Sequence, residues 1–300
     1  MVQQEFGGDW TQDKLARLKG YLEAYMQIFK DRPRLTPYYV DAFAGTGNIP
    51  TKSSPSANNS IDDPEEIDVD SFLNGSARVA LEVDPPFAHY LFIERSAKKV
   101  AELKKLKDEY VDRTARIQIE KADANEFLMK WCRETNWKNN RAVVFLDPFG
   151  MQVEWQLLER IAETEAIDLW LLVPLGMGVN RMLTHGDLPP KEWQERLTKF
   201  FGTDEWQEQF YTTPKQGSLF DDGPTKEKVA DWEALASYFL DRLKSIFKGG
   251  VAPNPLTQKN SKNAPLFLLC FAAGNPHAPS AIKIASQLLA KRPRGKKLRG

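Results

Sequence analysis

The sequence has little cysteine, little histidine and no long apolar run, and each of these absences excludes a class of protein. Its two cysteines, Cys132 and Cys270, lie far apart in apolar surroundings, which excludes a disulfide framework and a cysteine-rich metal site. We expect both to be buried thiols. No stretch reaches the ~18 apolar residues of a membrane span, and no basic segment precedes an apolar run at the N-terminus. These features predict a cytoplasmic protein without a membrane partner.

Hydrolase and metal signatures are also missing. The three histidines, His89, His185 and His277, have no partner at the spacing of a metal site or a catalytic triad. Neither a Gly-x-Ser-x-Gly elbow nor a His-Glu-x-x-His helix is present. Hydrolysis based on serine or zinc is therefore disfavoured, and we expect no metal ligand.

Charge is balanced overall but unevenly distributed. The formal net charge is zero. Segment 51–74 is rich in Asp, Glu, Ser, Asn and Pro, which predicts a long insertion loop without a core of its own. The Asp-x-Asp-x-Asp-Gly register of a calcium loop is missing from it. Six of the last ten residues, 291–300, are basic. Such a tail can neutralise phosphates, although a solvated terminus is the simpler interpretation.

What the sequence does contain is a regular alternation of buried strands and amphipathic helices. With 42% apolar residues in 300, it can build one large α/β domain or two small ones. Five strand-like runs alternate with helical patterns, which predicts a mostly parallel, doubly wound sheet with helices on both faces. The runs are 38–41, 90–94, 117–121, 142–146 and 167–173. A further strand pair ending at 266–271 is expected to close the sheet.

This pattern also predicts the domain organisation. Residues 1–36 form an N-terminal helix, capped by Asp9 or Thr11, that packs on the core. Residues 37–290 form the α/β domain, with the acidic loop 51–74 and a helical insertion at about 186–248. That insertion includes helices over 189–210 and 229–247. The basic tail 291–300 follows.

The first strand leads into a glycine turn, Asp41-Ala-Phe-Ala-Gly45-Thr-Gly47. In open α/β sheets such turns bind ligands at the carboxyl ends of strands. Pro50 replaces the third glycine of a dinucleotide fingerprint, and no Gly-Lys-Ser/Thr of a P-loop follows. The turn therefore favours a nucleoside ligand without a long phosphate chain, although a plain glycine turn explains it about equally well.

Acids also follow the second and third strands. Glu94 ends the run 90–94, where a carboxylate can accept hydrogen bonds from ribose hydroxyls. Asp123 and Glu126 stand at capping-box spacing, so Asp123 can cap the next helix. Alternatively, Asp123 can accept a proton from an adenine amino group. Both interpretations remain open.

The fourth strand ends in Asp147-Pro148-Phe149-Gly150. A carboxylate, a proline without an amide hydrogen and an aromatic ring would form an acceptor-rich pocket for an amine, with Phe149 stacked on a planar ring. Asp-Pro-x-Gly is equally a common β-turn pattern. After the fifth strand, Asn180 and Arg181 can reach the pocket mouth, where Arg181 would contact a phosphate or carboxylate, or lie on a helix surface.

Taken together, these strand ends resemble the class I S-adenosylmethionine (SAM)-dependent methyltransferase fold. The resemblance implies that Asp41 and the glycine turn surround the amino-acid part of SAM, Glu94 its ribose and Asp123 its adenine. It also implies that Asp147, Pro148 and Phe149 face the methyl acceptor. The implied cofactor-binding set is Asp41, Phe43, Ala44, Gly45, Gly47, Glu94, Asp123 and Ala124, with Asn180 and Arg181 on the substrate side.

More narrowly, the chain resembles the three-Cys-motif partner proteins, a bacterial family of methyltransferase-like proteins. The resembling pieces cover roughly residues 10 to 210. They are Trp10-Thr-Gln-Asp-Lys14, Tyr21-Leu-Glu-Ala-Tyr25, Tyr39-Val-Asp-Ala-Phe-Ala-Gly45, Gly75-Ser76, Phe145-Leu-Asp-Pro-Phe-Gly150 and Val179-Asn-Arg-Met-Leu183. The resemblance implies a partner with three cysteines that looks like a radical-SAM enzyme. The insertion between Gly47 and Gly75 departs from a compact turn-to-helix layout.

Two functional hypotheses follow. The first is a SAM-dependent methyltransferase of unknown acceptor, with nucleic acid as one candidate class. Amino-group methyltransferases of nucleic acids carry an acid or amide, two prolines and an aromatic after strand four. Here Phe149 and Gly150 replace the last two, so the match is partial and base amino methylation is not implied. The second hypothesis is a non-catalytic methyltransferase-like partner of the three-cysteine protein.

Overall fold

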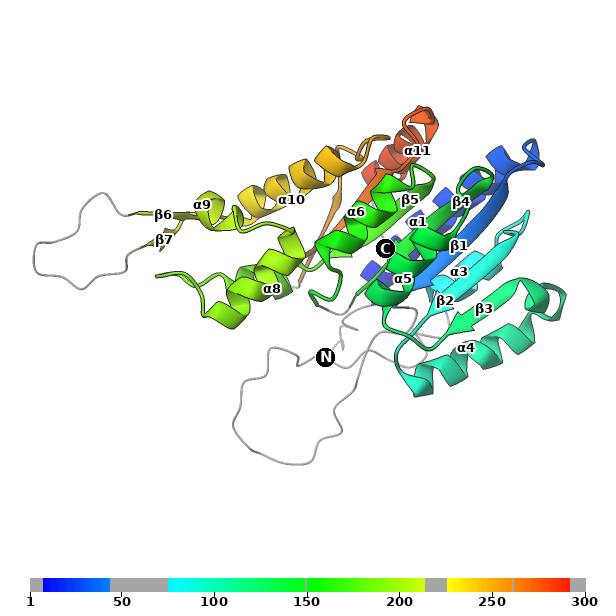
Figure 1. Ribbon diagram of the computed structural model, residues 1–300, viewed down its shortest axis with the longest axis horizontal. Coiled ribbons are helices and arrows are strands. Elements are labelled where there is room, and N and C mark those ends of the chain that lie inside the picture. Colours follow the sequence, from blue (N-terminus) through cyan, green and yellow to red (C-terminus); the bar gives the residue numbers. More distant parts are fainter. Residues whose placement is uncertain (1–7, 44–74, 149, 214–225, 261, 292–300) are drawn as a thin grey trace, which may run out of the picture.

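The computed structural model describes residues 8–43, 75–148, 150–213, 226–260 and 262–291, and within them an α/β Rossmann-like fold (Figure 1). Its main sheet has seven strands in the order β3-β2-β1-β4-β5-β9-β8. The strands are β1 (Thr36–Ala42), β2 (His89–Ile93), β3 (Ile117–Glu120), β4 (Asn140–Leu146), β5 (Ile167–Val173), β8 (Leu256–Lys259) and β9 (Pro265–Ala273). Strands β1 to β5 are parallel, and β9 runs antiparallel to both β5 and β8. The predicted fold class is confirmed, including the strand pair that closes the sheet.

The winding of the sheet reverses at β1. This strand pairs with β2 on one side and with β4 on the other, so that Val40 is level with Leu91 and with Val144. In doubly wound sheets the point of reversal leaves a crevice beyond the carboxyl ends of the strands. Here it lies between the ends of β1 and β4.

One face of the sheet is covered by α1 (Gly8–Lys30), α3 (Ser76–Leu81), α4 (Ala97–Glu109) and α11 (Pro279–Ala290). Helix α1 contributes Leu18, Tyr21 and Leu22, which are buried against the alternate residues Tyr39 and Trp170 of the sheet. Successive side chains along a strand point to opposite faces of the sheet. Tyr39 and Trp170 therefore point toward α1, and their strand neighbours point to the other face.

The other face is covered by α5 (Ala124–Glu134), α6 (Trp155–Glu163), α8 (Lys191–Phe201), α9 (Trp206–Phe210) and α10 (Trp232–Ile246). Phe201, Trp206 and Phe210 of the helical insertion are core residues, since all three are buried. Gly202 ends α8 at φ 71°, and a Cβ there would lie 2.1 Å from the Trp155 ring. Only glycine meets both demands.

The structure corrects two local predictions and adds one element that was not predicted. Helix α1 starts at Gly8, so Asp9 and Thr11 lie within it and not before it. Helix α10 starts at Trp232 because the Asp231 side chain accepts a hydrogen bond from the Ala234 amide at 2.9 Å. Val229 therefore lies outside the helix. A two-stranded ribbon, β6 (Tyr211–Thr212) with β7 (Glu227–Lys228), precedes α10 and was not predicted.

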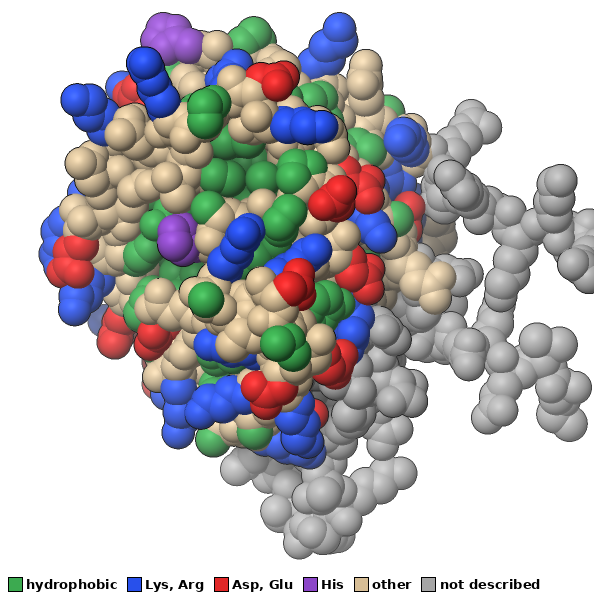
Figure 2. Space-filling view, turned by 90° about the vertical axis from the view of Figure 1, so that its right-hand side faces the viewer, with side chains coloured by type: hydrophobic (Ala, Val, Ile, Leu, Met, Phe, Trp, Pro, Cys, Tyr) green, Lys and Arg blue, Asp and Glu red, His purple; other side chains and the backbone are tan. Residues whose placement is uncertain are grey.

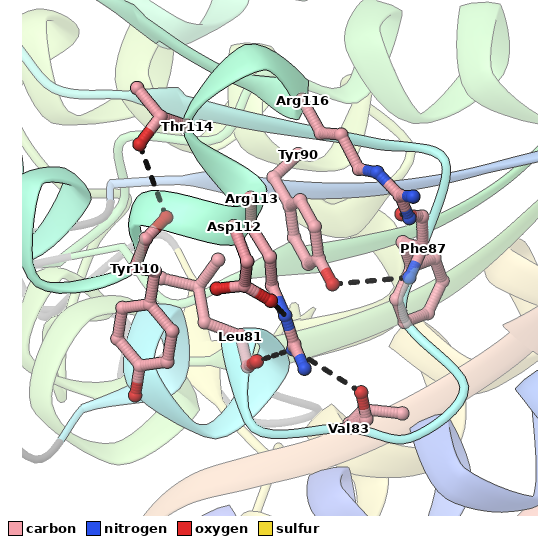
Figure 3. A network of polar contacts seen from close by, with 9 residues as sticks. All are labelled: Leu81, Val83, Phe87, Tyr90, Tyr110, Asp112, Arg113, Thr114 and Arg116. Atoms are coloured by element: carbon pink, nitrogen blue, oxygen red, sulfur yellow. Dashed lines mark hydrogen bonds and ion pairs between the residues drawn. The ribbon is translucent and has the colours of Figure 1, made fainter.

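The connection from α3 to β2 is anchored by arginines of a short 3₁₀ helix, η1 (Val111–Arg116) (Figure 3). The Arg113 guanidinium donates hydrogen bonds to the carbonyls of Leu81 and Val83, at the end of α3. Arg116 donates to the Phe87 carbonyl at 3.2 Å. These bonds satisfy carbonyls that the end of a short helix and its loop leave without partners.

Further predictions concern the cysteines, membrane spans, metal ligands and the charged segments. Both cysteines are buried free thiols, as predicted. No helix in the described part of the chain combines the length and hydrophobicity that crossing a bilayer requires. The described residues include no group of three or more His, Cys, Asp or Glu side chains placed to hold a metal ion. The acidic segment 51–74 and the basic residues 292–300 lie outside the described residues.

Candidate functional site

A cleft of about 710 Å³ lies at the carboxyl edge of the parallel strands. Its lining comes from the residues that follow β1, β2 and β3, from residues 151–154 of the loop between β4 and α6, and from side chains of α4 and α8. Helices α8 and α4 stand on opposite sides of this edge in the view of Figure 1. Four residues predicted to bind the cofactor line this one cleft: Phe43, Glu94, Asp123 and Ala124.

Glu94 is held in place at the cleft by the backbone on both sides. Its amide donates to the Glu120 carbonyl at 3.0 Å, and its Oε1 accepts a hydrogen bond from the Ser96 amide at 2.6 Å. The residue is 8% exposed. Beside it, burial lowers the pKa of Lys99 to about 8, and the charge of Glu94 acts in the opposite direction. A carboxylate fixed in this way can accept hydrogen bonds from a ligand without first being ordered.

Asp123 performs the capping role predicted for it. Its Oδ1 accepts hydrogen bonds from the amides of Asn125 at 2.9 Å and Glu126 at 3.2 Å, at the start of α5. Its neighbour Asn125 joins two walls of the cleft. The Asn125 amide group donates to the Gln152 carbonyl at 2.8 Å and accepts from the Glu154 amide at 3.0 Å. Sequence reasoning missed Asn125, because nothing local marks an asparagine that reaches another loop.

Phe43 adopts a backbone conformation that is unusual for its type. Its φ is 70°, in the left-handed region, and its amide donates to the Ile93 carbonyl at 3.1 Å. A residue with a Cβ is strained in this region by about 1–3 kcal/mol, and such strain clusters at ligand sites. The predicted residues Ala44, Gly45 and Gly47 that follow lie outside the described residues.

A second cluster lies at the reversal point between β1 and β4. Asp41 is fully buried, and the Tyr39 hydroxyl donates to its Oδ2 at 3.1 Å. No described residue forms a hydrogen bond with Oδ1. Burial raises the pKa of Asp41 to about 7; the hydroxyls of Ser76 and Tyr39 lower it, Asp147 raises it and Lys14 lowers it. Asp41 therefore changes charge near neutral pH.

Asp147 forms an ion pair with Lys14 of α1. The Lys14 side chain is 9% exposed and that of Asp147 is 22% exposed, so the pair is largely shielded from water. The ammonium also lies 5.8 Å from the centre of the Phe145 ring. Sequence analysis assigned Lys14 no role of its own, because the spacing that brings α1 over β4 is set by tertiary packing. Phe149 lies outside the described residues, and Pro148 is buried.

Asn180 and Arg181 are not among the residues that line the cleft. They follow β5 through η2 (Leu175–Val179) in the short helix α7 (Asn180–Met182), and both are exposed. The Asn180 side-chain oxygen accepts a hydrogen bond from Lys228 of β7 at 2.7 Å. Their role in substrate binding stays a prediction.

Comparison with known proteins finds only distant structural similarity. No protein-family model matches the chain, and no curated protein matches it either. Among solved structures, a Legionella pneumophila protein of the DUF519 family is 13% identical, with a TM-score of 0.49 and coverage of 94% of this chain and 92% of that chain. Magnesium protoporphyrin IX methyltransferase from Synechocystis, solved with bound SAM, is 12% identical, with a TM-score of 0.33 and coverage of 76% and 83%.

The assignment of the fold therefore rests on the sheet itself. Five parallel strands in the order β3-β2-β1-β4-β5 are followed by an antiparallel strand inserted before the last one. The chain has a methyltransferase-like fold.

Proposed function

We propose that this protein binds SAM in the cleft and transfers its methyl group to an acceptor placed at Asp147. One observation carries the proposal. Phe43, Glu94 and Asp123 follow three different strands, and all three belong to the predicted cofactor-binding set. All three line one cleft beside the point where the sheet reverses. A shared cleft is what a single nucleoside ligand requires.

The described residues fit SAM in size and in chemistry. The cleft falls within the range of about 300–1,000 Å³ typical of small-molecule sites. Glu94 offers hydrogen-bond acceptors suited to ribose hydroxyls. Asp41 has a buried Oδ1 without a described partner, and the cationic amino group of SAM is a donor that would satisfy it.

When bound, SAM supplies a methyl group on a positively charged sulfur. The chain itself would contribute position and exclusion of water, which are the main requirements of direct methyl transfer. Lys14 holds Oδ2 of Asp147, so the carboxylate is oriented before an acceptor arrives. Asp147 could then accept a hydrogen bond from an N–H or O–H group of the acceptor.

Calorimetric titration with SAM tests the proposal. The wild type should release or absorb heat, and Glu94→Gln should bind roughly tenfold more weakly, since a hydrogen bond to a charged group contributes about 1.5–3 kcal/mol. Glu102→Gln, on α4 but not among the residues that line the cleft, is the matched control and should bind like the wild type. Absence of heat with the wild type at millimolar SAM would overturn the proposal.

The resemblance to three-Cys-motif partner proteins motivates a second candidate, a methyltransferase-like fold that binds its partner without turnover. Phe149 and Gly150 favour it, because they replace a proline and an aromatic of amino-group methyltransferases. Co-purification with a three-cysteine protein separates the two. A stable complex that transfers no tritiated methyl group to nucleic acid or protein would support the binding role, and transfer would support the enzyme.

A further inference from the structure

We propose that the acceptor is a nucleic acid, whose phosphates bind four basic side chains on the walls of the cleft. The four are Arg95, Lys99, Arg196 and Lys199, here called the basic rim. This inference rests on the proposed function, because it names the chemical class of the methyl acceptor.

The basic rim is assembled from two elements that are distant in sequence. Lys99 lies in the first turn of α4 and Arg95 two residues before that helix, while Arg196 and Lys199 stand three residues apart on α8. Residues three apart on a helix lie on one side of it, so both α8 side chains line the same cleft. The cleft is therefore bordered by positive charges from two separate segments of the chain.

The buried basic side chains Lys14 and Arg17 have ion-pair partners, Asp147 and Asp13. Of the rim, Arg95, Arg196 and Lys199 are exposed and Lys99 is half-buried. Among the described residues other than Glu94, whose charge acts on Lys99, no carboxylate forms an ion pair with any of the four rim side chains. The acids that line the cleft are Glu94, Asp123 and Glu154. Glu94 and Asp123 are already bonded to backbone amides.

Lys99 shows that a rim charge is incompletely solvated. Its side chain is half-buried, and burial lowers its pKa to about 8 although Glu94 acts to raise it. A partly desolvated ammonium gains from an added anion. A phosphate bound at Lys99 would therefore restore interactions that burial removes.

The arrangement on two walls favours a strand of phosphates over a single anion. One phosphate could reach one wall, whereas a nucleic acid strand offers charges at regular steps on both sides of a base placed in the site. Figure 2, which looks onto the side where α4 lies, shows several Lys and Arg side chains in its lower part, with acidic side chains among them.

Fluorescence anisotropy with labelled single-stranded RNA and DNA of about 16 nucleotides tests the inference. The full chain is compared with Arg196→Gln/Lys199→Gln and with the control Lys30→Gln/Lys138→Gln. The control removes the same charge from exposed positions just before β1 and β4, at the opposite edge of the sheet. The rim variant should bind on the order of tenfold more weakly, and its salt slope should fall by about 1.4, or about 0.7 per lost contact. The control should keep the wild-type slope.

Three results would overturn the inference. One is equal weakening in the rim variant and the control. Another is loss of binding when the basic residues of 291–300 are replaced by Gln while the rim variant binds normally. The third is tighter binding of polyglutamate than of either oligonucleotide. Calorimetry with SAM keeps the two proposals apart: cofactor heat without oligonucleotide binding rejects the rim alone, and oligonucleotide binding without cofactor heat rejects the methyltransferase and hence the acceptor role.

Discussion

The two faces of the sheet are packed by different means. The α1 face contains four of the buried charged side chains of the described chain, namely Lys14, Arg17, Asp41 and Asp168. The opposite face buries large aromatic rings, including Trp155, Phe201 and Phe239, with few polar contacts between them. Apolar packing depends mainly on volume and shape, whereas a buried hydrogen bond or ion pair tolerates one geometry. The α1 face is therefore the one whose alignment is specified atom by atom.

Helix α1 shows how this alignment is achieved. Lys14, Arg17 and Tyr21 recur at steps of three and four, so they form one stripe. Each reaches a different anchor: Asp147 after β4, the last carbonyls of α11, and Asp168 in β5. Three anchors at once leave α1 a single position along the sheet. The same position delivers Lys14 to the proposed acceptor site.

The largest expected effect is on the aromatic face. Phe201→Ala should lower the free energy of unfolding by about 4 kcal/mol, because it removes a fully buried ring and leaves a cavity. The lost ring lies 5.1 Å from that of Phe200 and 5.4 Å from that of Tyr238. Urea denaturation measures the change, with Phe201→Leu as the milder control. A loss below about 1 kcal/mol would show that this face tolerates missing volume.

On the α1 face, Arg17→Met should lower the free energy of unfolding by about 3 kcal/mol. The substitution removes the guanidinium that donates hydrogen bonds to the carbonyls at the end of α11. Arg17 donates to Leu288, to Leu289 at 2.9 Å and to Lys291 at 2.7 Å, which satisfies the end of α11. Lys19→Met, on the exposed side of α1, should change stability by less than about 0.5 kcal/mol. If the two variants unfold alike, apolar contacts alone dock the helix.

Asp41→Asn should change the pH dependence of stability. In the wild type the pKa of Asp41 is about 7, which is above the pKa of the same carboxyl in the unfolded chain. Between these two pKa values the folded state therefore binds one more proton at Asp41 than the unfolded state does. Its stabilising contribution is present at low pH and is lost as the pH rises through 7. The free energy of unfolding of the variant, measured relative to that of the wild type, should therefore rise by about 2 kcal/mol from pH 5.5 to pH 7. Urea denaturation across that range decides the matter, and a constant difference would place the titration elsewhere.

Tyr21→Phe should have the smallest effect of the four substitutions, lowering the free energy of unfolding by about 1 kcal/mol at pH 8. The Tyr21 hydroxyl donates to Asp168 Oδ2 at 2.7 Å. Burial raises the pKa of Asp168 to about 6, and this hydrogen bond opposes the rise. Without the hydroxyl the carboxylate is harder to ionise, so the cost should appear above pH 6 and shrink below pH 5. Tyr25→Phe is the control, and an equal cost in both variants at both pH values would exclude this account.

Much of the fold follows from local patterns. The run 167–173 is apolar almost throughout and forms β5 with those bounds, because a strand buried on both faces has no polar side. Asp123 caps α5 as its spacing with Glu126 predicts. By contrast, the ribbon β6–β7 has two residues in each strand, too few for a periodic signal.

The sequence by itself determined the order of strands and helices and the acids at strand ends, because those depend on the spacing of apolar residues and on local capping. Only the tertiary structure decided which of these residues meet. Glu94, Asp123 and the basic rim share a cleft because three strand ends and α8 converge there. Lys14 reaches Asp147 across 133 positions of sequence. Contacts of this kind depend on how the helices pack on the sheet. The local periodicity of the sequence does not predict that packing.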